Sequence, residues 1–470
     1  MDIPIFYIQG DKRTVTDGYG NEYPDYLERS PKDNWNKKLG NICMRDMELQ
    51  ISFIECSLET LKERRYMSRK CDYQHLEKVA LGFKERAKRQ IDAIAAQICC
   101  SAFISKNDDI SFCIPHIKGT GSYSFDSSDM YLYDGLGGIA VFLAAVLKEN
   151  KCTLYAYVWR IIVDKLFEYT QNAVKTDKLQ PAQTGAVEGE GSLISTYLIL
   201  YEITRNRIFL KYARMQAKIV EQIWEKETCM DFLSGLSGVI VVLSDLYRIT
   251  GERGYLDQAV VMGEKVWKSC EMMNGGAGWK IEADVPPLAG LAHGNSGLLL
   301  ACGALLEHTG NKTYQERIDS LLIYEDSLFE NGNWKDLRQP GGKRLCNNAW
   351  CHGAAGILLS RLQLKKAGYS DKTGIVERDI QYCKQIFLEE REPDALCLCH
   401  GLGGNYMVLS YFLKYYADAE LEQEKRELGW RILMRIEKKQ ISAYEKHNPS
   451  LMSGMAGIGM ALFYAGRYEN

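Results

Sequence analysis

Short apolar runs recur along the chain, and each run follows a pair of glycines with the spacing G-x-x-G. A run such as residues 139–147 is apolar on every side, which is typical of a buried helix. A second segment follows each run and carries lysine and glutamate on one face, as in residues 255–269. Each unit therefore predicts two helices, one buried and one facing solvent.

This unit occurs seven times, with the second copy degenerate. The leading glycines of the seven copies are Gly135, Gly189, Gly235, Gly294, Gly353, Gly401 and Gly454. One such unit cannot bury its apolar helix alone, so the units must pack on one another. Seven helical hairpins closed in a ring predict an all-α protein, an α/α toroid with the apolar helices inside. At each leading glycine the missing side chain allows close approach and a positive φ.

The repeats leave an N-terminal part that does not share the pattern. We expect a small, mainly helical segment over residues 1–110 and the toroid over residues 111–470, with the boundary near residue 110.

Composition excludes several classes of protein. The chain has 470 residues, of which 46% are hydrophobic and 25% charged, with a formal net charge of -3. These values fit a globular protein and lack the basic excess of a nucleic-acid binder. No run of about 18 apolar residues could span a bilayer, and the first residues do not have the order of a signal peptide. We therefore expect a cytoplasmic protein, whose 15 cysteines are mostly reduced thiols.

Two of the units place Cys-His directly before the leading glycine, as Cys351-His352 and Cys399-His400. Thiolate and imidazole are preferred ligands of zinc, and a helix N-terminus favours the thiolate. If all four side chains bind, the site is closed and structural, whereas three ligands leave one position open to substrate. The alternative is that the cysteines pack and the histidines cap their helices.

Three further residues are candidates for the same site. His293 precedes the leading glycine of the fourth unit and could act as an acid or base near neutral pH, or cap its helix. Asp231 lies four residues before Gly235 and is either a residue of this site or a helix cap. Trp350 either walls a pocket or packs in the core.

These motifs, in this order and spacing, resemble the lanthionine synthetase C-like cyclases from about Met130 onward. The resemblance implies a zinc-bearing α/α barrel that closes thioether rings in ribosomally made peptides. It implies that Cys351, Cys399 and His400 bind zinc, that His293 is the catalytic acid or base, and that Asp231 is an active-site carboxylate.

In that family pattern the position of His352 is not a ligand, which favours the open site with three ligands. His352 and Trp350 are then expected to line the substrate pocket.

Residues 1–65 resemble the end of the dehydratase part of class II lanthipeptide synthetases, on the evidence of residues 2–7 and 46–57. The ATP-binding and kinase-like residues of that dehydratase would lie upstream. The chain therefore resembles the cyclase half of such an enzyme, and we expect no dehydration from it. Its expected partners are a dehydrated precursor peptide, leader plus core, and a dehydratase domain or chain.

The expected reaction is addition of a zinc-activated peptide cysteine to dehydroalanine or dehydrobutyrine, which forms lanthionine or methyllanthionine. One alternative is a non-catalytic member of the same family that binds a thiol such as glutathione, or a peptide. A carbohydrate-active toroid is a third class, but that chemistry usually needs two carboxylates beside a cleft and has no use for paired Cys-His motifs.

Overall fold

The structure is a computed structural model that describes residues 5–59, 67–70, 82–118, 122–175, 183–338, 344–389 and 391–468. Its contacts divide the chain into two compact units, residues 1–62 and residues 63–470. Residues 2–4, which carry part of the N-terminal resemblance, lie outside the described residues.

The first unit combines a small sheet with two helices. An antiparallel sheet has the order β1 (Phe6–Ile8), β2 (Val15–Asp17), β3 (Glu22–Tyr23), and is followed by α1 (Pro31–Gly40) and α2 (Met44–Glu59). The start of α1 is set locally, because the Ser30 side chain accepts a hydrogen bond from Asp33 N and a proline occupies the first turn. The helices were expected, whereas the sheet was not.

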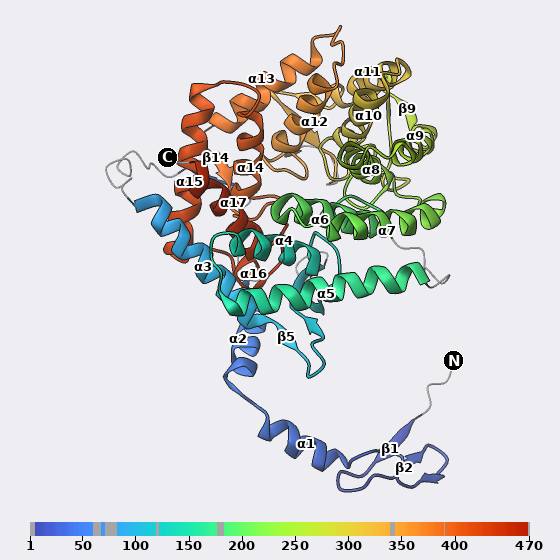
Figure 1. The fold of residues 1–470 in the computed structure, drawn as a ribbon, viewed down its shortest axis with the longest axis vertical. Coiled ribbons are helices and arrows are strands. Elements are labelled where there is room, and N and C mark those ends of the chain that lie inside the picture. Colours follow the sequence, from blue (N-terminus) through green and yellow to red (C-terminus); the bar gives the residue numbers. More distant parts are fainter. Residues whose placement is uncertain are drawn as a thin grey trace. The chain divides into compact units, whose positions relative to one another are not determined.

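Seven apolar helices close into a ring in the second unit (Figure 1). They are α4 (Leu136–Leu147), α6 (Glu190–Thr204), α8 (Leu236–Thr250), α10 (Asn295–Thr309), α12 (Ala354–Lys366), α14 (Leu402–Phe412) and α17 (Met455–Tyr468). Each contacts the next in this order, and α17 contacts α4. This closure confirms the predicted α/α toroid. Within the described ranges no helix is both long and apolar enough to cross a membrane.

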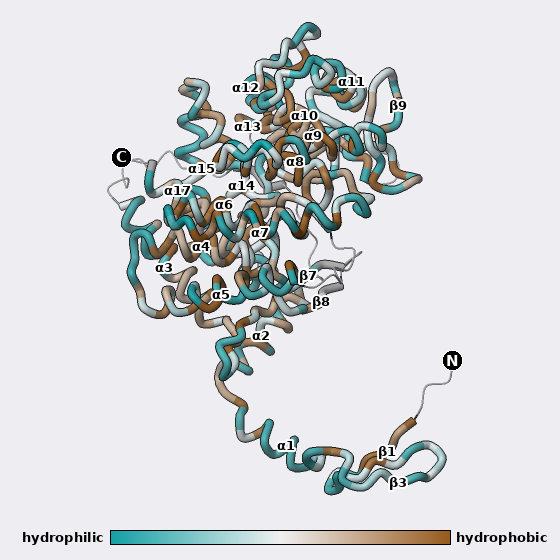
Figure 2. Tube along the Cα trace, turned by 45° about the vertical axis from the view of Figure 1, so that its right-hand side comes forward, coloured by the Kyte–Doolittle hydropathy of each residue, from teal (hydrophilic) through white to brown (hydrophobic). Residues whose placement is uncertain are grey.

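A second set of seven helices packs around these inner helices. It comprises α3 (Phe83–Ser101), α5 (Thr153–Lys175), α7 (Ile208–Ile223), α9 (Arg253–Lys268), α11 (Thr313–Asp326), α13 (Ile375–Leu388) and α15 (Ala419–Glu437). The inner α4 is buried from Leu136 to Val146, whereas α9 buries a stripe at helical spacing that includes Leu256, Ala259 and Met262. Figure 2 shows the same difference, since α10 is largely brown and α15 has long teal stretches.

The outer helix of the seventh pair comes from the N-terminal side of the toroid. Six inner helices pair with the outer helix that follows them, but α17 pairs with α3, which precedes all the repeats. The contacts accordingly divide the chain at Lys62, well before the boundary expected near residue 110. Because α3 lies outside the repeated pattern, its sequence did not indicate that it completes the ring.

Short elements occupy the connections between the helices. These are the strand pairs β4 (Met67–Arg69) with β14 (Arg391–Pro393), β5 (Phe103–Ile104) with β6 (Ile110–Ser111), β7 (Cys113–Lys118) with β8 (Ser122–Ser127) and β9 (Glu271–Met273) with β10 (Gly276–Gly278), the sheet β11 (Phe329–Glu330), β12 (Asn333–Asp336) and β13 (Arg344–Leu345), and the short helices η2 (Trp224–Lys226) and α16 (Ala443–His447).

The leading glycines directly precede the inner helices, as predicted. Two reasons for glycine at this position were expected, close approach of the backbone and a positive φ. Gly189 alone of the seven has a positive φ, of 100°. Close approach is the common reason: a Cβ at Gly294 would lie 2.6 Å from the Leu288 carbonyl oxygen, and one at Gly401 would lie 2.6 Å from that of Ala395. Each loop therefore folds back over the start of its own helix.

A closed belt of backbone hydrogen bonds joins the seven loops that precede the inner helices. In each loop the residue two positions before the leading glycine donates its N–H to the carbonyl of the equivalent residue in the next loop, over 2.8–3.2 Å. The residues of this rim belt are Tyr133, Val187, Leu233, Ala292, Cys351, Cys399 and Met452. The N–H of Met452 donates to the carbonyl of Tyr133, which closes the belt.

The crowding at the helix starts predicts that two glycine substitutions differ in their effect on the stability of the fold. In Gly238→Ala the new methyl group would meet the Phe232 carbonyl oxygen and lie 2.5 Å from Ala186 N, so we expect a loss of about 1–3 kcal/mol of stability. Gly254, in the outer helix α9, has no atom near the equivalent position, so Gly254→Ala should be neutral or stabilising. Thermal unfolding followed by calorimetry tests both variants, and equal melting temperatures would contradict the crowding argument.

Candidate active site

The rim belt brings together side chains from residues that are far apart in the sequence. The position directly after each belt residue is occupied in turn by Asp134, Glu188, Ser234, His293, His352, His400 and Ser453. Three histidines therefore follow one another on one side of the ring, and two carboxylates follow one another on the other. The two cysteines of the belt, Cys351 and Cys399, lie on the histidine side.

Cys351 and Cys399 contact each other through both backbone and side chain. Cys351 N donates to Cys399 O over 3.1 Å, and the Cys399 thiol donates a hydrogen bond to the Cys351 sulfur. That side-chain bond lowers the pKa of Cys351 and, together with burial, raises the pKa of Cys399 well above the usual thiol value. Cys351 is therefore the more acidic of the two thiols.

The two neighbouring histidines are held in their neutral form. Close packing lowers the pKa of His400, although its side chain is open to solvent, and burial lowers the pKa of His352 well below the usual value. The His352 imidazole donates a hydrogen bond to the Ala289 carbonyl. Over the described ranges, no three His, Cys, Asp or Glu side chains are gathered closely enough to hold a metal ion. The structure therefore joins Cys351 to Cys399 and leaves His400 beside them.

His293 and Asp231 form a hydrogen-bonded pair across adjacent repeats. His293 Nδ1 lies 2.5 Å from Asp231 Oδ2, and Asp231 Oδ1 accepts a hydrogen bond from Ser234 N over 2.8 Å. The Asp231 side chain is 1% exposed, whereas that of His293 is 27% exposed. A proton on Nδ1 leaves Nε2 as the other ring nitrogen able to exchange protons. The two residues proposed from sequence as one unit are thus in contact.

His293 also lies near the cysteine side of the ring. Its ring centroid is 5.4 Å from that of His352, which directly follows Cys351. Trp350 packs edge-on against Phe232, with ring centroids 6.3 Å apart, and is partly buried against the core. All the residues expected at the site therefore belong to loops that the rim belt connects.

Sequence reasoning missed two residues close to the thiols. Tyr133 forms a side-chain hydrogen bond with Cys399, and burial raises the pKa of its phenol well above the usual value. Its signal was present, because Tyr133 occupies the same position in its repeat as Cys351 and Cys399. Arg338 helps to lower the pKa of Cys351 by its positive charge, and it donates two hydrogen bonds to Asp336. Arg338 lies on a non-repeated loop, so no sequence pattern indicated it.

Two carboxyl groups on the opposite side of the ring were also missed. The Ser453 hydroxyl donates to Asp134, and Ser234 Oγ donates to Glu188 over 3.3 Å. Burial raises the pKa of both Asp134 and Glu188. Both directly precede a leading glycine, which is the position that His293 and His400 occupy in their repeats.

Comparison with known proteins agrees with this arrangement. Residues 126–467 match the family described as lanthionine synthetase C-like protein. The chain belongs to the lanthionine synthetase C-like family. The matched segment includes every residue that the sequence analysis placed at the site.

Two relatives illustrate how far the similarity extends. Over 440 residues the chain is 22% identical to the lacticin 481/lactococcin biosynthesis protein LcnDR2 of Lactococcus lactis subsp. lactis, covering 90% of this chain and 44% of that protein. This lanthionine synthetase C-like chain thus spans less than half the length of that relative. The solved structure of nisin cyclase superposes with a TM-score of 0.56 at 17% identity, covering 72% of this chain and 89% of that one, and shares the fold.

The unequal thiols predict selective alkylation in metal-free protein. Because a lower pKa gives a larger thiolate fraction at pH 7.5, iodoacetamide should modify Cys351 before Cys399. Cys346, whose pKa burial raises to about 12, should also react more slowly than Cys351, and the exposed Cys43 supplies a reference rate. Peptide mapping by mass spectrometry gives the order, and modification of Cys399 first would contradict the shared-proton geometry.

Proposed function

We propose that this protein is a zinc-dependent lanthipeptide cyclase. It adds a cysteine thiol of a dehydrated precursor peptide to dehydroalanine or dehydrobutyrine in the same peptide, which forms lanthionine or methyllanthionine. The observation that carries the proposal is the meeting of a thiol pair and a histidine–aspartate pair on one side of the rim belt, in a member of this family.

The donor set fits zinc. A divalent cation can replace the proton that Cys351 and Cys399 share, and the neutral imidazole of His400 is the form that binds metal. The family pattern, in which the position of His352 is not a ligand, supports three protein ligands and an open fourth position. Zinc bound there would lower the pKa of a substrate thiol, so that a thiolate forms at neutral pH.

The other residues of the rim handle the proton and the substrate. A carbon–sulfur bond and a Cα–H bond form, while the S–H bond and the π bond of the dehydro residue break, so the addition is balanced. His293 moves that proton through Nε2, and Asp231 orients the imidazole and stabilises its charged form. Trp350 and His352 line the substrate pocket. Holding both reacting groups in one site makes the addition effectively intramolecular.

Removing a thiol ligand should remove both metal and activity. We expect Cys351→Ala and Cys399→Ala to lose zinc by elemental analysis and to lose ring closure. Cys397→Ala removes a neighbouring buried thiol and is the matched control, which should keep both. Ring closure is measured with a dehydrated peptide as disappearance of free thiols without a change in mass. Full zinc retention in either ligand variant would refute the assignment.

Removing the acid–base pair should affect rate but not metal. We expect His293→Ala to keep zinc and to lower kcat by about 10²–10⁴-fold, since a positioned acid–base group contributes roughly that factor. Asp231→Asn should give a smaller loss, because the imidazole remains but is no longer held by a carboxylate. An unchanged rate in His293→Ala would exclude this residue from the mechanism.

The second candidate is a non-catalytic module that binds a thiol such as glutathione, or a peptide. The thiol pair alone would suit either function, but the buried Asp231 that holds His293 favours an enzyme. The same thiol assay decides, because a binding module leaves the free thiols of the dehydrated peptide intact.

The substrate requires a preceding reaction that dehydrates serine or threonine. We propose that a dehydratase domain or chain supplies it in the cytoplasm of a bacterium and that this chain does not itself dehydrate. The greater length of the Lactococcus relative supports a further domain. Residues 1–62 form their own unit, in which the apolar side chains of Trp35, Ile42 and Met44 are exposed and could contact another protein.

A further inference from the structure

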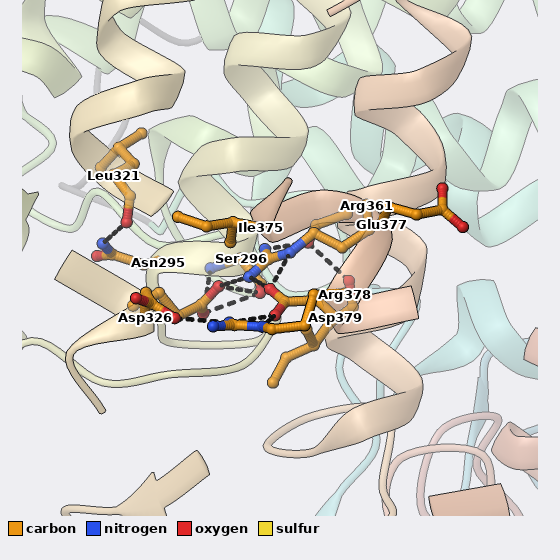
Figure 3. Close-up of polar contacts among 12 residues, drawn as sticks. Asn295, Ser296, Leu321, Asp326, Arg361, Ile375, Glu377, Arg378 and Asp379 are labelled. Carbon is orange, nitrogen blue, oxygen red and sulfur yellow. Dashed lines mark hydrogen bonds and ion pairs between the residues drawn. The ribbon is translucent and has the colours of Figure 1, made fainter. Parts of the chain in front are cut away.

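A buried ionic network lies beneath the loop that carries His293. Glu325 on α11, Arg361 on α12 and Asp379 on α13 all have side chains with no exposed surface. Arg361 lies 2.7 Å from Glu325 Oε2 and 2.7 Å from Asp379 Oδ2. Figure 3 shows Arg361 and Asp379 converging with Ser296, from the first turn of α10. The network therefore links elements of the fourth and fifth repeats.

Glu325 also holds the His293 loop directly. Its Oε1 accepts hydrogen bonds from Gly290 N over 3.1 Å, from Ser296 N over 3.1 Å and from Ser296 Oγ over 2.9 Å. These contacts lie on both sides of His293 in the sequence. Together with Arg361 they give the carboxylate a full set of donors, which a buried charge requires.

The other face of the same loop is attached to the loop of Cys351. Leu291 N and Ala292 N both donate to Cys351 O, over 3.0 and 2.9 Å. Gly290, with φ of 99°, passes so close that a Cβ would lie 2.9 Å from the Cα of His352. The loop is thus fixed between Glu325 on one side and Cys351 on the other.

We infer that Glu325, held by Arg361, is a positioning residue that sets the separation between His293 and the Cys351 thiol. The inference rests on the proposed function, since it assigns Glu325 a part in the same reaction. A rigid separation matters because a shift of about 1 Å can cost a factor on the order of 10² in rate. Glu325 acts through the loop and touches no reacting atom.

The chain supplies a matched control in another repeat. Glu227 Oε2 accepts hydrogen bonds from Thr184 N over 2.9 Å and from Thr184 Oγ1 over 3.0 Å, and so pins the loop before α6 in a similar way. That loop carries none of the residues proposed for zinc binding or proton transfer. Glu227 is half-buried, so Glu227→Gln controls for the loss of a carboxylate that holds a rim loop.

The experiment compares Glu325→Gln with Glu227→Gln in the full chain. In Glu325→Gln we expect faster amide hydrogen exchange at residues 288–296 without substrate, and a kcat lower by about 10–100-fold, with KM and bound zinc unchanged. Glu227→Gln should retain the exchange of residues 288–296 and the kcat of the wild type. Wild-type exchange or kcat in Glu325→Gln, or an equal loss of kcat in Glu227→Gln, overturns the inference.

The test also covers two other cases, a Glu325→Gln variant that does not fold and a wild-type protein that closes no rings. If Glu325→Gln does not fold, Ser296→Ala takes its place, because it keeps the ion pair and removes only the hydroxyl that donates to Glu325. We expect Ser296→Ala to raise hydrogen exchange at residues 288–296 and to lower kcat a few-fold. No change in either quantity would overturn the inference. If the wild type closes no rings, the proposed function fails. The exchange comparison then still decides whether Glu325 holds the loop.

Discussion

The closed belt of seven backbone hydrogen bonds brings together the loops that carry the residues proposed for the active site. It holds the starts of seven inner helices side by side and requires each loop to fold back over its own helix. Glycine is needed at that point because a side chain would meet the carbonyl six residues earlier. Residues about fifty positions apart in the sequence thereby become neighbours, and Cys351 meets Cys399 through a direct backbone bond.

Burial at this rim produces the chemical properties of the site. The hydrogen bond between the two buried thiols lowers the pKa of Cys351 and raises the pKa of Cys399. Burial also lowers the pKa of His352 well below its usual value, while the buried Asp231 holds His293 by a direct hydrogen bond. The groups proposed to bind metal and to transfer the proton therefore share one environment, and the ionic network around Glu325 holds the loop that carries His293.

Much of this arrangement follows from the repeated pattern, and the exceptions lie where the pattern ends. The seven units, their inner helices and the pairing of Cys-His motifs were predictable from spacing. Tyr133 shares the register of the two cysteines, yet a search for reactive residue types passed over it. Arg338 and α3 lie outside the repeats, so their places beside Cys351 and α17 depend on packing that no local signal records.

By itself the sequence determined the toroid, the number of its units and the residue types at the start of each inner helix. Periodicity is sufficient for this, because each apolar run must be buried and each glycine must allow close approach. Only the tertiary structure decided that Cys351 and Cys399 bond to each other with unequal pKa values, that Asp231 contacts His293, and that Glu325 holds the His293 loop. These properties depend on burial and on distances of a few ångströms between separate repeats. The spacing of motifs along the sequence gives neither the burial of a side chain nor its distance from another repeat.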